Sequence, residues 1–414
     1  MTTPAIRLPS LHIPQVPDVF EKADVQPWLH DEDKVHRPIL KVIGLGGGGC
    51  NAISRMVELE IKGIEFIAAN TDHQALEKNP APIKIQLGPG VTRGLGAGGD
   101  PRVGQAAALE SSREIAEAVK GADMVFLTAG MGGGTGTGSI PVAAKIARNQ
   151  GAVTIAVVTT PFSFEMGRRQ RNATDGLAKL RQHTHTLIAI PNDRLLSFAP
   201  RDLPLETAFR LADDVLRQAV QGITELITES GMINVDFAHI RRMMQMGGGA
   251  LMSIGHGQGE NKAFQAIEQA LNHPLLDTIP LDQANGIIAN FTGGSDLTLF
   301  EVEAALSHLQ AETQSKSEIV LGVINDDSMH GRTQVILVVT GIGTLSLEET
   351  VSKLGHQKSP IQRIETTSQP ETCVPCSGGT EPHETPPFAQ LVSAASANDL
   401  DLPAFLRRRP RVIG

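Results

Sequence analysis

Cysteine is scarce in this 414-residue sequence, and Cys50, Cys373 and Cys376 provide no disulfide framework. No apolar run is long enough to cross a bilayer, so we expect no direct insertion into a membrane. Basic residues are also in deficit: 36 Lys and Arg against 45 Asp and Glu give a net charge of −9, which argues against binding nucleic acid through a basic surface. The N-terminus lacks a basic start and an apolar signal core. This composition indicates a large cytosolic protein with room for two domains.

The sequence also lacks the phosphate-binding pattern GxxxxGK[ST], so no P-loop lysine is available. Glycine is abundant instead, and "AGMGGGTGTGSI" (Ala129–Ile140) places six glycines between Gly130 and Gly138. Glycine loses more backbone entropy on ordering than any other residue. The run therefore marks either a flexible linker or a backbone that must approach something closely, and its flanks decide between the two.

Predicted strands flank this glycine run on both sides. "DMVFLTA" (Asp123–Ala129) and "AVTIAVVTT" (Ala152–Thr160) are continuous apolar runs, typical of a sheet buried on both faces. Between them we expect a helix that is capped by Ser139, carries Pro141 in its first turn and ends at Gly151. The run is then the strand-to-helix turn of a βαβ unit, where free N–H groups and a helix dipole bind anions. This place favours a phosphate-binding loop over a linker.

Two further glycine loops extend the pattern. "PILKVIGLGGGGCNAISRMVELE" (Pro38–Glu60) indicates a strand, a glycine turn and a helix, followed by a second strand over Ile64–Asp72. Its GxGxxG pattern is also found in dinucleotide-dependent dehydrogenases, but the acid of the second strand comes late for a ribose contact. The additional loop "GLGAGGD" (Gly94–Asp100) exceeds what a dinucleotide fold needs. Several backbone loops that converge on one site suit a triphosphate held without a lysine.

The chain as a whole is predicted to be an α/β protein. We expect a Rossmann-like nucleotide-binding domain with a parallel sheet, a long central helix near Leu205–Glu229, and a second, smaller α/β domain with a mixed sheet. The second domain carries no obvious cluster of metal ligands or nucleophiles. The expected boundaries are a disordered arm over 1–37, the first domain over 38–203, the helix segment 204–231, the second domain over 232–343, a disordered linker over 344–397 and a terminal peptide over 398–414.

The terminal peptide, "DLDLPAFLRRRPRVIG" (Asp399–Gly414), restores apolar residues beside four arginines. A frayed, solvated tail is one interpretation, but an apolar core at the end of a tether is more typical of a docking peptide. We expect partners to contact Asp399, Leu402, Pro403, Phe405 and Leu406. In the linker, Cys373, Cys376 and His383 suggest zinc, but a structural site normally takes four ligands. A pair of ordinary thiols is the favoured interpretation.

The ordered motifs of this chain resemble those of the FtsZ family in the tubulin/FtsZ superfamily. "GGGTGTG" (Gly132–Gly138) is similar to the signature loop of that family, and the resemblance covers about residues 38–343 and resumes at the terminal peptide. Further matching motifs are "KVIGLGGGGCNA", "NTD", "GLGAGGDP", "TPFSFE", "PNDRLL", "DDVLRQAVQGI" and "NVDFA". The resemblance implies a GTPase that binds GTP and GDP with Mg²⁺ and assembles into head-to-tail filaments of the mid-cell division ring, in the bacterial cytoplasm. It also implies that division proteins and membrane tethers bind the terminal peptide.

The resemblance assigns roles to residues of each motif. Backbone amides of the glycine loops would hold the phosphates, Phe209 would stack on the base, and Asp213 would accept from the N1–H and amine of guanine. Glu165 and Arg169 would lie at the ribose, and Asp72 would help to place Mg²⁺. The complete implied GTP site is Gly47, Gly48, Gly49, Cys50, Asn51, Asp72, Gly98, Gly99, Gly132, Gly133, Gly134, Thr135, Gly136, Glu165, Arg169, Phe209 and Asp213.

Hydrolysis in this family is shared between subunits, which the resemblance carries over to the loop Gly231–Arg242. This loop would enter the nucleotide site of the next subunit, where Asp236 would orient the attacking water or a cation. The family pattern Asn-x-Asp-x-x-Asp is broken here, because His239 replaces the second carboxylate. Two functions therefore stay open: a division-ring GTPase, or a filament-forming GTP-binding paralogue with weak hydrolysis and a mainly structural role.

Overall fold

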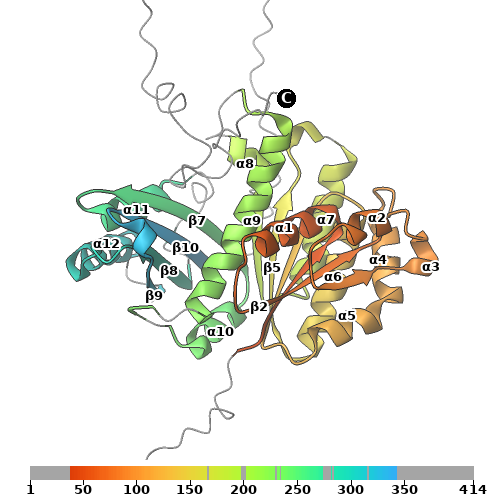
Figure 1. Ribbon diagram of the computed structural model, residues 1–414, viewed down its shortest axis with the longest axis horizontal. Coiled ribbons are helices and arrows are strands. Elements are labelled where there is room, and N and C mark those ends of the chain that lie inside the picture. Colours follow the sequence, from red (N-terminus) through yellow and green to blue (C-terminus); the bar gives the residue numbers. More distant parts are fainter. Residues whose placement is uncertain are drawn as a thin grey trace, which may run out of the picture. The chain divides into compact units, whose positions relative to one another are not determined.

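The computed structural model describes most of the chain between residues 38 and 342 (Figure 1). The described residues are 38–165, 167–196, 202–228, 231–233, 235–273, 281, 284–314 and 317–342. The predicted N-terminal arm, the linker with Cys373 and Cys376, and the terminal peptide lie outside them. The expectations for those segments, and the domain boundaries as a whole, stay predictions.

One continuous sheet runs through the described part in the strand order β3-β2-β1-β4-β5-β6-β7-β10-β8-β9. Neighbouring strands from β3 to β7 are parallel, β10 is antiparallel to β7 and β8, and β8 is parallel to β9. The expected parallel and mixed parts are confirmed, and the pairing of β6 with β7 joins them. The strands are β1 (Leu40–Leu45), β2 (Ile64–Asn70), β3 (Ile83–Gln86), β4 (Met124–Gly130), β5 (Val153–Thr160), β6 (Thr186–Pro191), β7 (Gly249–Gln258), β8 (Gly286–Gly293), β9 (Glu318–Asn325) and β10 (Arg332–Ile342).

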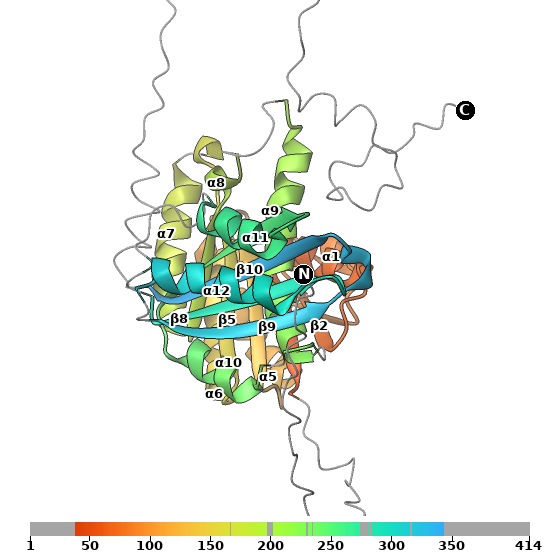
Figure 2. The ribbon, with the colours of Figure 1, turned by 90° about the vertical axis from the view of Figure 1, so that its left-hand side faces the viewer.

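Helices cover both faces of this sheet. Figure 1 shows the predicted central helix, α9 (Leu205–Thr228), between the two parts of the sheet, and Figure 2 looks onto α11 (Lys262–Leu271) and α12 (Leu299–Glu312). The remaining α-helices are α1 (Gly46–Glu58), α2 (His73–Glu77), α3 (Pro89–Thr92), α4 (Pro101–Glu110), α5 (Ser112–Val119), α6 (Thr135–Asn149), α7 (Arg168–Arg181), α8 (Asn192–Leu196) and α10 (Phe237–Gln245).

Strand β5 shows why the apolar runs are continuous. Its sequence is VTIAVVTT, and all eight residues are buried. Val153 and Val157 pack into the core formed with α1, α9 and α10, whereas Ala156 and Val158 pack into the core formed with α4 to α7. Because helices cover both faces, every position of the strand is apolar or small.

The helix after the glycine run begins earlier than the sequence predicts. α6 starts at Thr135, so Ser139 and Pro141 lie inside the helix rather than at its start. The low helix propensity of glycine hides this first turn from a reading of the sequence. The glycines allow α6 to pack closely against α4. A Cβ on Gly138 would lie only 2.6 Å from the backbone nitrogen of Gln105.

Replacement of Gly138 by alanine is expected to destabilise the fold. The added methyl group would press on Pro101 O and Gln105 N, which are backbone atoms of α4 and cannot move independently of that helix. We expect Gly138→Ala to lower the free energy of unfolding by about 1–3 kcal/mol, measured by urea denaturation. Gly133→Ala is the control, because a Cβ there meets no described atom within 4 Å. Equal unfolding free energies for the two variants would contradict this packing argument.

Candidate nucleotide-binding site

Three glycine loops lie at the carboxyl ends of β1 and β4 and before α4. The first loop (Gly46–Gly49) opens α1 directly after β1, and the third loop (Gly130–Gly138) ends β4 and opens α6. The second loop (Gly94–Asp100) leads into α4. β1 and β4 are parallel neighbours, so the first and third loops leave the sheet side by side at the same edge.

The backbones of these loops touch one another. A Cβ on Gly46 would lie 2.7 Å from the backbone nitrogen of Gly136, which brings the first loop against the third. A Cβ on Gly134 would lie 2.8 Å from the backbone nitrogen of Asp100, which brings the third loop against the second. No side chain fits at either contact, and the three loops form one surface as the sequence predicts.

Part of this surface faces empty space. A Cβ on Gly47, Gly98, Gly99 or Gly133 would meet no described atom within 4 Å. Neither α1 nor α6 has a side-chain cap or an acidic residue in its first turn. Their first N–H groups are therefore available, and both helix dipoles favour negative charge at this point. This arrangement suits the phosphates of a nucleotide.

Side-chain hydrogen bonds hold the loops together. The hydroxyls of Thr71, after β2, and Thr135, at the start of α6, lie 2.6 Å apart. The amide nitrogen of Asn172 on α7 donates to Gly99 O at 3.2 Å and to Gly132 O at 3.3 Å. The cradle is thus fixed from β2 on one side and from α7 on the other.

Asp72 lies beside the second loop, where it forms an isolated bridge with Leu95. One of its carboxylate oxygens accepts from Ala75 N at 3.1 Å and caps α2. Within the described ranges, no group of three or more His, Cys, Asp and Glu side chains is placed to hold a metal ion. Mg²⁺ is usually held by substrate phosphates, waters and one or two carboxylates, so a single carboxylate at this position fits it.

Glu165 and Arg169 lie together between β5 and α7. The Glu165 carboxylate accepts from Phe162 N at 2.9 Å and forms an ion pair with the guanidinium of Arg169. The side chain of Glu165 is only 9% exposed, whereas that of Arg169 is 56% exposed. The two residues that the family resemblance assigns to the ribose are therefore paired with each other.

Phe209 and Asp213 lie one turn apart near the start of α9. The Phe209 ring is partly exposed and packs edge-on against Phe162, with ring centroids 5.4 Å apart. The Asp213 carboxylate lies 3.4 Å from the guanidinium of Arg55 on α1, which also donates to Arg210 O at 2.9 Å. Burial raises the pKa of Asp213 to about 6, although the positive charge of Arg55 opposes the rise. The carboxylate is therefore mainly ionised at neutral pH.

Cys50 contributes only its backbone to this surface. Its thiol is buried and lies against the carbonyl oxygens of Gly44 and Ala69, 3.6 and 3.7 Å away. Burial raises the pKa of Cys50 to about 12, so the thiol stays protonated at neutral pH. The next residue, Asn51, is exposed on the outer side of α1. Of this pair, only Asn51 offers a side chain to a ligand.

Asp236 and His239 do not join the glycine loops. Both lie in or next to α10, where Asp236 caps the helix by accepting from Ala238 N at 2.9 Å. The other end of α10 is fixed to the first residue of β6, because the Thr186 hydroxyl donates to Met244 O at 2.7 Å. α10 therefore lies at the amino edge of the parallel strands, opposite the edge that carries the glycine loops (Figure 1).

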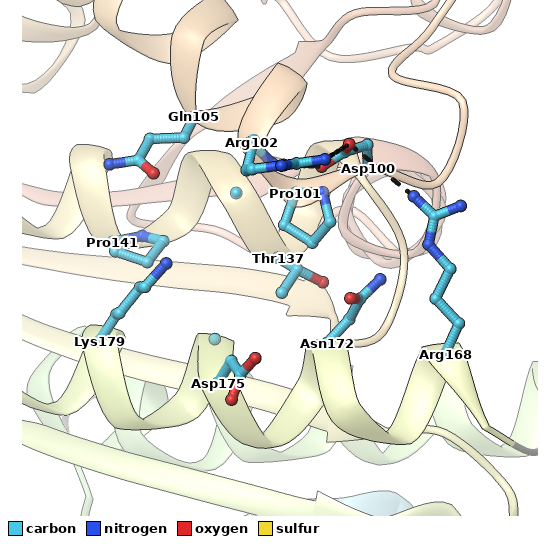
Figure 3. Close-up of a pocket in the computed structure, with 12 residues that line it drawn as sticks. Asp100, Pro101, Arg102, Gln105, Thr137, Pro141, Arg168, Asn172, Asp175 and Lys179 are labelled. Atoms are coloured by element: carbon cyan, nitrogen blue, oxygen red, sulfur yellow. Dashed lines mark hydrogen bonds and ion pairs between the residues drawn. The ribbon is translucent and has the colours of Figure 1, made fainter.

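A polar cavity of about 330 Å³ lies between α4, α6 and α7 (Figure 3). On its wall Asp100 binds Arg102 and lies 3.9 Å from Arg168. The hydrogen bond from Arg102 lowers the pKa of Asp100 to about 2. The cavity borders the second loop at Asp100 and the third loop at Thr137 and Gly138, but its lining contains none of the glycines that face empty space. It is therefore distinct from the phosphate cradle.

Two family models match the chain: the GTPase domain of the Tubulin/FtsZ family over residues 39–200, and the C-terminal domain of the FtsZ family over residues 248–343. A solved FtsZ dimer from M. jannaschii is 44% identical, with a TM-score of 0.71 over 75% of this chain and 90% of that one. The chain belongs to the FtsZ family. CetZ2 from Haloferax volcanii, solved as a GTPγS-bound protofilament, shares the fold at 20% identity, with a TM-score of 0.66 over 76% of this chain and 97% of CetZ2.

Membership of this family makes the chain a tubulin-like GTPase whose ligands are GTP and GDP. The dehydrogenase alternative is thereby removed. The family matches do not test which residues bind the nucleotide, so the roles of the implied FtsZ-type site remain predictions.

Three polar side chains of this part of the fold have no role in the site that the sequence motifs predict. Asn192 lies in the quoted "PNDRLL" motif, and its buried amide oxygen has no partner among the described residues. Asn172 and Arg55 lie on helices whose local sequence gives no signal, because their partners are 40 to 158 residues away. Only the "PNDRLL" motif offered a signal, since a polar residue directly after a buried strand points to the ligand edge of the sheet.

Asp213→Ala is expected to weaken GTP binding selectively. In the predicted role Asp213 accepts from the N1–H and amine of guanine, and an unpaired buried donor costs on the order of 1–3 kcal/mol. GTP affinity should therefore fall roughly tenfold or more while weak ATP binding barely changes, since adenine lacks that donor pair. Competition binding with both nucleotides measures this. Equal losses for the two would show general damage to α9 instead.

The same residue sets the pH range of the effect. Because the pKa of Asp213 is raised to about 6, the acceptor is present above that pH and is lost as the pH falls through it. GTP affinity of the unaltered protein should drop between about pH 7 and pH 5, and Asp213→Ala should remove this dependence. A pH profile shared by both proteins would contradict the role of Asp213.

Proposed function

We propose that this FtsZ-family chain is a self-assembling GTPase that forms head-to-tail filaments and hydrolyses GTP at the contact between subunits. The observation that carries the proposal is the separation of the two halves of the active site within one chain. The glycine loops lie at the carboxyl edge of the parallel strands, and α10 is fixed to the amino edge through Thr186. A second subunit must then supply the hydrolysis loop.

The two halves are held apart by α9. This helix has 24 residues and is therefore about 36 Å long at 1.5 Å per residue. Phe209 and Asp213 lie near its first turns, and the chain continues from its last turn toward Asp236. An interface that joins one edge to the opposite edge is heterologous, so it repeats as an open filament rather than closing on itself.

At the nucleotide, we propose that the amides of the three glycine loops hold the phosphates, the second loop closing over the γ-phosphate. Glu165 and Arg169 are assigned to the ribose, Phe209 and Asp213 to the base, and Asp72 to Mg²⁺. Asn192 is added as a further contact, because its buried amide oxygen lacks a partner among the described residues. When bound, Mg²⁺ neutralises negative charge on the phosphates.

In the cell, we propose a role in the division ring at mid-cell, in the bacterial cytoplasm, with partners that grip the terminal peptide. Its residues Asp399, Leu402, Pro403, Phe405 and Leu406 lie outside the described part, so this remains a prediction. No helix of the described part has the length and apolarity needed to cross a bilayer. In this proposal, proteins that bind the terminal peptide link the filament to the membrane.

A mixing experiment tests the shared active site. The Asp213→Ala variant should have a weakened nucleotide site and an intact hydrolysis loop. The Asp236→Ala variant should have an intact nucleotide site and a defective hydrolysis loop. Each should release phosphate from GTP slowly by itself, and an equimolar mixture should be faster than either, because some contacts then combine two intact halves. For the unaltered protein, phosphate release per subunit should rise steeply with concentration, together with the sedimented fraction.

The matched control mixes each variant with the double variant, which can complete no additional site. A mixture of the single variants no faster than the mean of its components would contradict the proposal. Phosphate release per subunit that is constant with concentration would also contradict it.

One observation favours the second candidate, a filament with slow hydrolysis. His239 stands exposed at the place where the family pattern has a second carboxylate. An imidazole, unlike a carboxylate, brings no negative charge with which to help hold a cation beside the triphosphate. A neutral imidazole would instead be able to act as a base.

His239→Asp is therefore expected to speed GTP turnover and to shorten the lifetime of filaments once GTP is exhausted, without preventing assembly. Phosphate release and light scattering measure the two effects. His239→Ala is the control, since it removes the imidazole without adding a carboxylate. If His239→Asp is no faster than the unaltered protein, Asp236 alone carries the step or His239 already serves as the base.

A further inference from the structure

Asn172 connects two loops that the sequence places far apart. It lies on α7, and Figure 3 shows its side chain pointing from that helix toward Asp100 and Thr137. Its amide nitrogen donates to Gly99 O in the second loop and to Gly132 O in the third, at 3.2 and 3.3 Å. An amide nitrogen has two hydrogens, so one side chain can make both bonds at once.

The two carbonyl groups that accept these bonds belong to Gly99 and Gly132, and both glycines have positive φ angles. Gly99 has a φ of 72° and Gly132 a φ of 99°, in the region that favours glycine. In a trans peptide the carbonyl and the following N–H point in opposite directions. With Gly132 O turned toward Asn172, the N–H of Gly133 points away from α7. A Cβ on Gly133 would meet no described atom within 4 Å, so there is room for a ligand beside this residue.

The helix that carries Asn172 is firmly seated. Ala173, the next residue, is 1% exposed. One turn further, a Cβ on Gly176 would lie 2.8 Å from the methyl carbon of Met131, in the third loop itself. α7 therefore packs directly on the third loop, and Asn172 reaches the second loop from a fixed base.

We propose that Asn172 is a positioning residue that locks the second loop to the third and thereby sets the preference of the site for GTP over GDP. The inference rests on the proposed function, in which the second loop closes over the γ-phosphate. A diphosphate needs the first and third loops alone. A triphosphate also needs the second loop at the correct distance from the third, and Asn172 provides this link without touching the nucleotide.

The test compares binding of GDP and of GTPγS, a slowly hydrolysed GTP analogue, to the full-length chain with Mg²⁺. Displacement of a fluorescent GDP analogue is measured at protein concentrations below assembly. For Asn172→Ala, we expect GTPγS affinity to fall about fivefold or more, with GDP affinity changed less than about twofold, from the loss of two hydrogen bonds. Asn172→Asp should show a larger loss for GTPγS, because it turns a carboxylate toward two carbonyl oxygens.

Thr174→Ala is the matched control. Thr174 is exposed on the same helix, and its hydroxyl donates to Gln170 O, one turn back. This variant should keep the GTPγS to GDP affinity ratio of the unaltered protein. Thermal unfolding without nucleotide reports general damage to α7 separately.

An unchanged affinity ratio in Asn172→Ala would overturn the inference, and so would equal losses for both nucleotides, which indicate a structural role only. Failure of the unaltered protein to bind either nucleotide would overturn the proposed function itself, and this inference with it. If the unaltered protein binds both nucleotides and only the expected effect of Asn172→Ala is missing, the proposed function stands and this inference alone is wrong.

Discussion

Direct contact between glycine backbones is the constraint on which the rest of the site depends. α1 and α6 present their N-termini side by side only because neither Gly46 nor Gly136 carries a side chain at their contact. Three arginines near the loops are already paired with carboxylates: Arg102 and Arg168 with Asp100, and Arg169 with Glu165. Attraction for phosphates must then come mainly from backbone N–H groups and two helix dipoles. Such a cradle needs no P-loop lysine.

The second constraint is the direction of the parallel strands. All their carboxyl ends lie at one edge, which puts the glycine loops together and leaves the opposite edge to α10. α9 is buried along Leu216, Ala219 and Val220, so it cannot bend to bring the two edges together. Assembly between subunits is the physical route by which one edge meets the other, and GTP hydrolysis is thereby linked to filament growth in the proposed function.

Much of this arrangement could be predicted from local sequence. Buried parallel strands can be recognised in the sequence as unbroken apolar runs, as in Val153–Thr160. The helix α9 can be recognised by its stripe of apolar residues. The sequence alone places the start of α6 too late, because glycine disfavours helix and close packing against α4 compensates for this cost. Asn172 and the buried thiol of Cys50 could not be predicted, since their surroundings are assembled from distant parts of the chain. Family resemblance supplied the residue roles that local physics leaves open.

The most direct test of the backbone cradle is an electron cryomicroscopy map of the full-length chain assembled with a slowly hydrolysed GTP analogue. We expect density for the phosphates against the amides of Gly47–Gly49, Gly98–Gly99 and Gly133–Gly136, with Asp236 of the next subunit facing the γ-phosphate. Nucleotide density in the polar cavity between α4, α6 and α7, or phosphates held by arginine side chains instead of the loops, would contradict it.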